Sequence, residues 1–110
     1  MTTALTFQSR STKGMIERPA YFIKDGLAVA RPIRDDKYWM IGQVMTGMSL
    51  GRLRWRSKVK AKAALLEILP LTDWMDPRFK DLNAFFLGKN FYEKIRVIAM
   101  KHGAKEHVDT

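Results

Sequence analysis

An Asp-Gly pair at positions 25 and 26 constrains the fold of this chain more than any other local feature. It stands between two β-prone runs within 20-AYFIKDGLAVARPI-33. Asp-Gly in this setting is a strong short-range signal for a two-residue β-hairpin with a type I′ turn. The sequence therefore predicts two antiparallel strands that meet at Asp25 and Gly26.

A second hairpin is predicted within 37-KYWMIGQVMTGMSLGRLRW-55, around Thr46 and Gly47. In a strand, alternate side chains share a face, so Trp39, Ile41, Gln43 and Met45 would lie together. Asp35 and Asp36 form a polar turn between the two hairpins, and Pro32 limits the end of the strand before them. Four antiparallel strands in meander order follow from this pattern.

Three helices are predicted after the strands. Ser57 is a suitable N-cap for a helix over 58–69, Asp76 and Pro77 begin one over 76–88, and a third over 91–103 ends at Gly103. The helix over 58–69 has apolar residues around most of its circumference, which predicts burial between the sheet and the later helices. The expected fold is α+β, a four-stranded antiparallel meander followed by three helices on one face (ββββααα).

The chain has 110 residues, which suits one domain with one hydrophobic core. Residues 1–19 mix Thr, Ser and charged residues, and we expect a flexible N-terminal arm there, with a short edge strand over 4–8 as the alternative. Residues 20–104 form the expected α+β domain. Residues 105–110 are expected to be a frayed tail.

Basic residues are concentrated in the first part of the chain. The sequence has 20 Lys and Arg against 11 Asp and Glu, a formal net charge of +9. Residues 1–60 contain 12 basic and 4 acidic residues (+8), whereas residues 61–110 contain 8 and 7 (+1). Such an asymmetry predicts a localised basic face that attracts polyanions.

The segment 51-GRLRWRSKVKAK-62 places a basic residue at every second position from Arg52 to Lys62. On a strand, Arg52, Arg54 and Arg56 would share one face. One side of an antiparallel sheet is often simply solvated, but like charges on the same face destabilise a strand, and this segment has no acidic residue to offset them. We interpret this face as a binding site for a polyanion.

Lysines also occupy the start of the predicted helix, where the helix dipole favours acids. Lys58 and Lys62 lie about 40° apart around the helix axis, whereas Lys60 points away. We therefore expect Lys58 and Lys62 to act with Arg56, and Lys60 to be separate. Of the aromatic residues, Trp55 is the best candidate to stack on a base because it lies between Arg54 and Arg56, whereas Tyr21, Phe22, Tyr38 and Trp39 are expected to belong to the core.

Catalytic signatures are missing from the sequence. There is no cysteine, the two histidines are His102 and His107, and no glycine-rich phosphate loop is present. The expectation is a protein that is not an enzyme, with no metal and no cofactor. The first residues do not resemble a secretory signal, and no apolar run is long enough to span a membrane, so a cytoplasmic location is expected, without membrane binding.

The leading hypothesis is a small, non-catalytic domain that binds DNA or RNA through phosphate contacts. The residues assigned to this site are Arg52, Arg54, Trp55, Arg56, Lys58 and Lys62. One alternative is an accessory or inhibitor protein, of the kind carried by phages and mobile elements, that binds an acidic or nucleic-acid-binding protein partner. Another is a subunit of a larger ribonucleoprotein.

Overall fold

A computed structural model describes residues 5–11, 14–32, 37–77 and 89–106. The strands are β1 (Thr6–Ser11), β2 (Gly14–Lys24), β3 (Leu27–Ala30), β4 (Met40–Gln43), β5 (Leu53–Arg54) and β6 (Lys105–Glu106). The helices are α1 (Lys58–Ile68) and α2 (Lys89–Lys101), with a short 3-10 helix, η1 (Leu69–Leu71), directly after α1.

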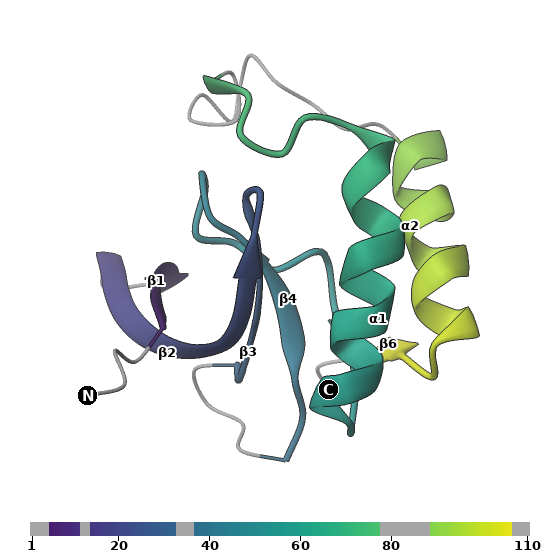
Figure 1. The fold of residues 1–110 in the computed structure, drawn as a ribbon, viewed down its shortest axis with the longest axis horizontal. Helices are drawn as coiled ribbons and strands as arrows, with labels where there is room; N and C mark the ends of the chain where they lie inside the picture. Colours follow the sequence, from purple (N-terminus) through teal and green to yellow (C-terminus); the bar gives the residue numbers. More distant parts are fainter. Residues whose placement is uncertain (1–4, 12–13, 33–36, 78–88, 107–110) are drawn as a thin grey trace.

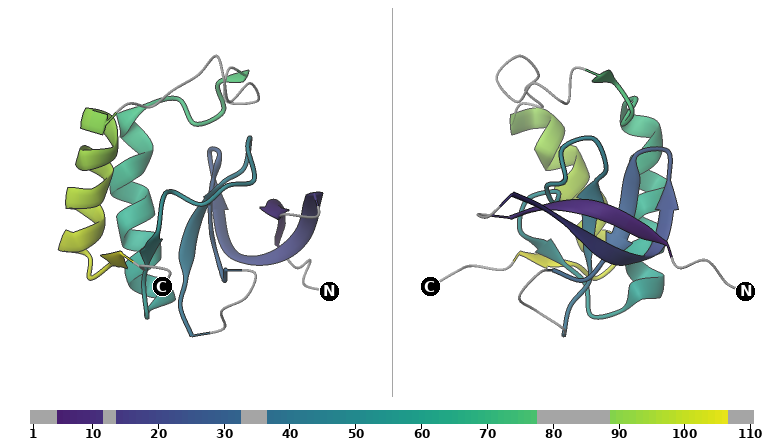
Figure 2. Two further views of the ribbon diagram at one scale, coloured as in Figure 1. Left: turned by 180° about the vertical axis from the view of Figure 1, so that it is seen from behind. Right: turned by 90° about the vertical axis from the view of Figure 1, so that its left-hand side faces the viewer.

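The predicted fold class is confirmed: the chain is α+β, with an antiparallel meander followed by helices. Four strands pair in the order β1-β2-β3-β4. Helices α1 and α2 lie together on one side of this sheet (Figures 1 and 2). The described residues contain two α-helices where three were predicted for the chain, and most of the predicted middle helix, over 76–88, lies outside them.

The hairpin at Asp25 and Gly26 forms as predicted. Asp25 has a φ of 48° and Gly26 a φ of 97°, and Lys24 pairs with Leu27 across the turn. Positive φ at both central residues is the requirement of a type I′ turn, whose twist matches that of the flanking strands. Local turn chemistry therefore determines the register between β2 and β3.

Alanine at Gly26 is expected to lower the free energy of unfolding by more than alanine at Gly14. Gly26 has a φ of +97°, and a Cβ there would lie 2.7 Å from the carbonyl oxygen of Trp74. Gly14 has a φ of +109°, but a Cβ there would meet nothing within 4 Å. A left-handed backbone costs an L-residue roughly 1–2 kcal/mol, so Gly14→Ala measures that strain alone. Equal losses for the two variants in chemical denaturation would show that Gly26 does not contact Trp74 closely.

The edge strand β1 lies in the segment expected to be a flexible arm, so that expectation is wrong for residues 6–11 and 14–19. Their pairing runs from Thr6 with Pro19 to Ser11 with Gly14. Phe7 explains why β1 is ordered: it is buried, and its ring packs where a side chain on Gly42 of β4 would otherwise stand. The alternative prediction, a short edge strand over 4–8, agrees better with the structure, in which β1 covers Thr6–Ser11.

The last predicted strand does not extend the four-stranded sheet. Its residues meet the β4 region only through isolated bridges, Trp39 with Trp55 and Gly42 with Ser49. Strand β5 instead pairs with β6, which places Leu53 opposite Glu106 and Arg54 opposite Lys105. The expectation of a frayed tail is therefore wrong for residues 105–106.

Both faces of the sheet are covered, which explains why all four residues of β3 are buried. Leu27 and Val29 belong to the main core with the helices. Ala28 and Ala30 belong to a second, smaller core with Phe7 of β1 and Met40 of β4. Because alternate residues of a strand point to opposite faces, β3 contributes to two cores at once.

Helix α1 is buried on one side only, contrary to the prediction that it is enclosed between two layers. Its buried residues are Ala61, Ala64, Leu65 and Ile68. Val59 and Leu66, on another side of the helix, are 63% and 43% exposed. In Figure 1 and the left view of Figure 2, α2 lies on the side of α1 away from the sheet, but the exposure of Val59 and Leu66 shows that α2 leaves that part of the helix surface uncovered.

Candidate functional site

The basic segment before α1 alternates between buried and outward residues. Leu53 and Trp55 are buried, whereas Arg52 and Arg56 are exposed and Arg54 is half-buried. The three arginines therefore lie on the outward side of this segment. Trp55 is 1% exposed and packs in the main core, so the expectation that it stacks on a base is wrong. Alternation places Trp55 on the side opposite to the arginines.

Ser57 joins this segment to the helix. It has an extended backbone, and its Oγ accepts a hydrogen bond from the backbone N–H of Lys60 at 3.3 Å, as an N-cap does. The first turn of α1 contains no acidic residue. Lysines thus occupy a helix end that the dipole makes favourable for negative charge.

Lys58 and Lys62 lie over the aromatic residues of β2. The Nζ of Lys58 is 4.8 Å from the ring centroid of Tyr21, and the Nζ of Lys62 is 4.5 Å from that of Phe22. Neighbouring residues of a regular strand point to opposite faces, but the β2–β3 register shifts between Ala20 and Phe22. The bulge at Tyr21 explains how two consecutive aromatic rings both reach lysines of α1.

Trp39 adds a third ring beside these lysines. Tyr21 meets it edge-on with ring centroids 6.1 Å apart, and the guanidinium of Arg31 lies 4.3 Å from its ring centroid. Lys58 lies 6.0 Å from the same ring. We call Tyr21, Phe22, Trp39, Arg31, Lys58 and Lys62 the aromatic–basic face.

A cavity of about 260 Å³ opens at this face. Its lining consists of Arg18, Pro19, Ala20, Tyr21, Arg31 and Trp39. Tyr21 is 37% exposed, so the expectation that its ring belongs to the core is wrong, whereas Trp39 packs against the main core and is partly exposed. The aromatic composition hinted at such a site, but the bulge that brings Tyr21 to Trp39 has no signature in the sequence.

Lys60 lies apart from Lys58 and Lys62, as predicted. It lies together with Arg56, however, which was expected to act with Lys58 and Lys62. It lines a cavity of about 180 Å³ together with the arginines of the basic segment. The lining residues are Tyr38, Arg54, Trp55, Arg56, Ser57, Lys60, Gly103 and Lys105. We call this cavity the basic pocket. Arg56 is therefore grouped with Lys60, whereas Lys58 and Lys62 lie over the rings of β2.

Several charged residues of the described C-terminal part pair with one another. Glu67 of α1 pairs with Lys101 at 2.6 Å and with His102 at 3.3 Å, and Arg96 pairs with Glu106. The hydrogen bond from Lys101 is the main cause that lowers the pKa of Glu67, and Glu106 raises the pKa of Arg96. None of the described ion pairs includes Arg56, Lys58, Lys60 or Lys62.

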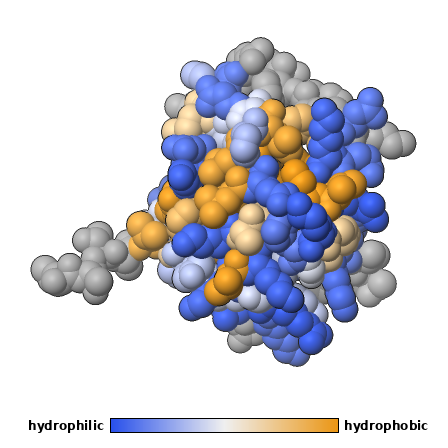
Figure 3. Space-filling view, turned by 45° about the vertical axis from the view of Figure 1, so that its right-hand side comes forward, coloured by the Kyte–Doolittle hydropathy of each residue, from blue (hydrophilic) through white to orange (hydrophobic). Residues whose placement is uncertain are grey.

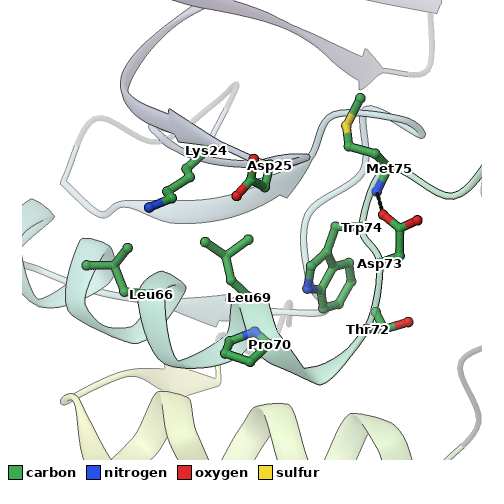
Figure 4. Close-up of a pocket in the computed structure, with 9 residues that line it drawn as sticks. All are labelled: Lys24, Asp25, Leu66, Leu69, Pro70, Thr72, Asp73, Trp74 and Met75. Carbon is green, nitrogen blue, oxygen red and sulfur yellow. Dashed lines mark hydrogen bonds between the residues drawn. The ribbon is translucent and has the colours of Figure 1, made fainter.

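A hollow larger than these two cavities lies elsewhere and has a different chemistry. It measures about 530 Å³ and is formed largely by apolar residues at the end of α1 and in the segment after it (Figure 4). Its charged residues are Lys24, Asp25 and Asp73, and the Asp73 carboxylate accepts a hydrogen bond from the backbone N–H of Met75 at 3.0 Å. Two carboxylates make this hollow a poor site for an anion.

No known protein family, curated protein or solved structure matches this chain. Within the described ranges, no group of three or more His, Asp or Glu residues is arranged to hold a metal ion. The helices of the described part are all too short or too polar to cross a membrane.

Proposed function

We propose that this protein is a non-catalytic nucleic-acid-binding domain that favours single strands. Arg52, Arg54, Arg56, Lys58 and Lys62 contact phosphates, and Tyr21 and Trp39 replace Trp55 as the residues that stack on bases. The observation that carries this proposal is the aromatic–basic face, where lysine and arginine side chains lie over partly exposed rings.

The chemistry of this face suits an unpaired strand. Proteins that bind single strands combine a positive surface along the backbone with aromatic rings on which bases stack. Lys58 and Lys62 supply the charge, and neither forms any of the described ion pairs. Phosphate contacts give affinity and salt dependence but do not select a sequence. The expected binding is therefore strongly salt-dependent with weak sequence preference.

Fluorescence anisotropy with labelled single-stranded and duplex DNA and RNA, at two salt concentrations, tests the proposal. We expect single strands to bind more tightly than duplexes of the same sequence. The logarithm of the binding constant for single strands should fall against the logarithm of salt with a slope of about −0.7 for each phosphate contact. If no nucleic acid binds at low micromolar protein in low salt, the proposal fails.

A second candidate is the accessory or inhibitor protein that binds a protein partner. The outer side of α1 favours it, because the apolar residues Val59 and Leu66 are exposed there. The surface that carries the helices also shows apolar patches between hydrophilic regions (Figure 3). Failure of the anisotropy experiment would make this candidate the leading one.

A further inference from the structure

We propose that the basic pocket binds a phosphate monoester, the terminal phosphate of a nucleic-acid strand. This inference rests on the proposed function. It assigns the pocket to the end of a nucleic-acid strand, whereas the other phosphate contacts lie along the interior of that strand. Four basic side chains line it, from Arg54, Arg56, Lys60 and Lys105, and no acidic residue does. Arg54 and Arg56 are also proposed to contact phosphates along the nucleic-acid strand, whereas Lys60 and Lys105 are not.

The pairing of β5 with β6 creates an electrostatic conflict in the pocket wall. Arg54 lies directly opposite Lys105 in this antiparallel pair. Like charges at directly opposite positions destabilise a pair of strands. The sheet is only two residues long on each side, and Arg54 also donates a hydrogen bond to the carbonyl oxygen of Leu53 at 2.9 Å. An anion between the two side chains would turn the repulsion into attraction.

Lys60 reaches the same place from the helix. A Cβ at Gly103 would lie 3.5 Å from its Cδ and 3.8 Å from its Nζ, so the side chain extends along the turn that leads into β6. Strand β6 lies beside the first turns of α1 in both views (Figures 1 and 2). Arg56 completes the group, with its guanidinium 5.8 Å from the ring centroid of Tyr38.

The size and charge of the pocket favour a compact group with more than one charge. At about 180 Å³ it is smaller than the cavity at the aromatic–basic face, which measures about 260 Å³. A phosphate monoester carries a charge of about −1.5 to −2 at neutral pH, whereas each phosphodiester of a continuous strand carries one negative charge. A cluster of four cations therefore attracts the end of a strand more strongly than its interior.

Two single-stranded oligonucleotides of one sequence, with and without a 5′-phosphate and labelled at the 3′ end, test the inference with the full chain. We expect the terminal phosphate to tighten binding by about fivefold or more, as new charge-assisted hydrogen bonds would. In Lys60→Gln/Lys105→Gln this preference should disappear, and the affinity for the 5′-hydroxyl strand should change by less than about twofold. A 3′-phosphate strand, labelled at the 5′ end, shows whether the pocket accepts either end.

The control variant, Lys24→Gln/Lys94→Gln, removes two exposed lysines that do not line the pocket and should keep the preference. The variant Lys60→Arg/Lys105→Arg should keep it too, and circular dichroism checks that each variant folds. Equal affinity of wild-type protein for strands with and without either terminal phosphate would overturn the inference and leave the proposed function intact. Binding of neither strand would overturn both. A preference that survives Lys60→Gln/Lys105→Gln would show that the end is bound elsewhere.

Discussion

The double variant Lys58→Gln/Lys62→Gln should bind a single-stranded oligonucleotide on the order of a hundredfold more weakly than wild-type protein at low salt. Each hydrogen bond to a charged group contributes about 1.5 kcal/mol, and two lost contacts amount to about 3 kcal/mol, or roughly two factors of ten. Both lysines lie over rings of the aromatic–basic face, so their loss weakens charge and stacking geometry together. Anisotropy titrations measure the change.

The salt dependence of this variant provides an independent check. Two lost phosphate contacts should make the slope of log K against log salt less steep by about 1.4, at 0.7 for each contact. Lys24→Gln/Lys94→Gln removes the same net charge from residues outside the aromatic–basic face, and it should keep most of the affinity. An equal loss in both double variants would mean that overall charge, and not this face, drives binding.

Replacing Leu65 by alanine should lower the free energy of unfolding by about 2–5 kcal/mol, the range for a fully buried leucine. Leu65 has no exposed surface and packs in the main core, whereas its neighbour Leu66 is 43% exposed. Leu66→Ala, the matched control in the same helix, should cost less than about 1 kcal/mol. Urea denaturation of both variants measures the difference.

This comparison also tests the orientation of α1. If Leu66→Ala destabilised the protein as much as Leu65→Ala, α1 would be enclosed on both sides, as its apolar circumference suggested. A large loss for Leu65 alone supports the arrangement in which the outer side of α1 faces away from the core. That outer side would then remain available to a partner.

The parts of the fold that could be predicted from sequence depend on local chemistry. Asp25 and Gly26 adopt the positive φ angles of their turn, and Ser57 caps α1, because each of these effects involves residues close together in the chain. Strand β1 was not the leading prediction because it is held in place by the packing of Phe7 against Gly42, a residue far away in the sequence. The pairing of β5 with β6 joins residues about half the chain apart, and no short-range signal indicates it.

In the candidate site, too, the features set by local sequence could be predicted, whereas those set by contacts between distant elements could not. The alternation of side chains in the basic segment correctly predicted that three arginines share one face. The same alternation places Trp55 on the opposite, buried face, so Trp55 could not be both between the arginines and exposed to a base. Helix geometry correctly separated Lys60 from Lys58 and Lys62. It did not indicate that Lys60 would line a cavity together with Lys105, or that a bulge at Tyr21 would direct that ring to Trp39. Those contacts depend on how distant elements pack.

The intrinsic fluorescence of Trp39 tests the central claim most directly. Trp55 and Trp74 are each 1% exposed, so Trp39 is the most accessible of the three tryptophans and the one on which a base can stack. An unlabelled oligothymidine should quench the emission, and quenching should saturate at the concentration at which anisotropy does. In Trp39→Phe, which keeps a ring at this position, the strand should still bind. The remaining emission, from Trp74 and from Trp55 in the wall of the basic pocket, should change far less than that of wild-type protein. Binding to wild-type protein with no change in its fluorescence would contradict the account, because the strand would then lie away from the aromatic–basic face.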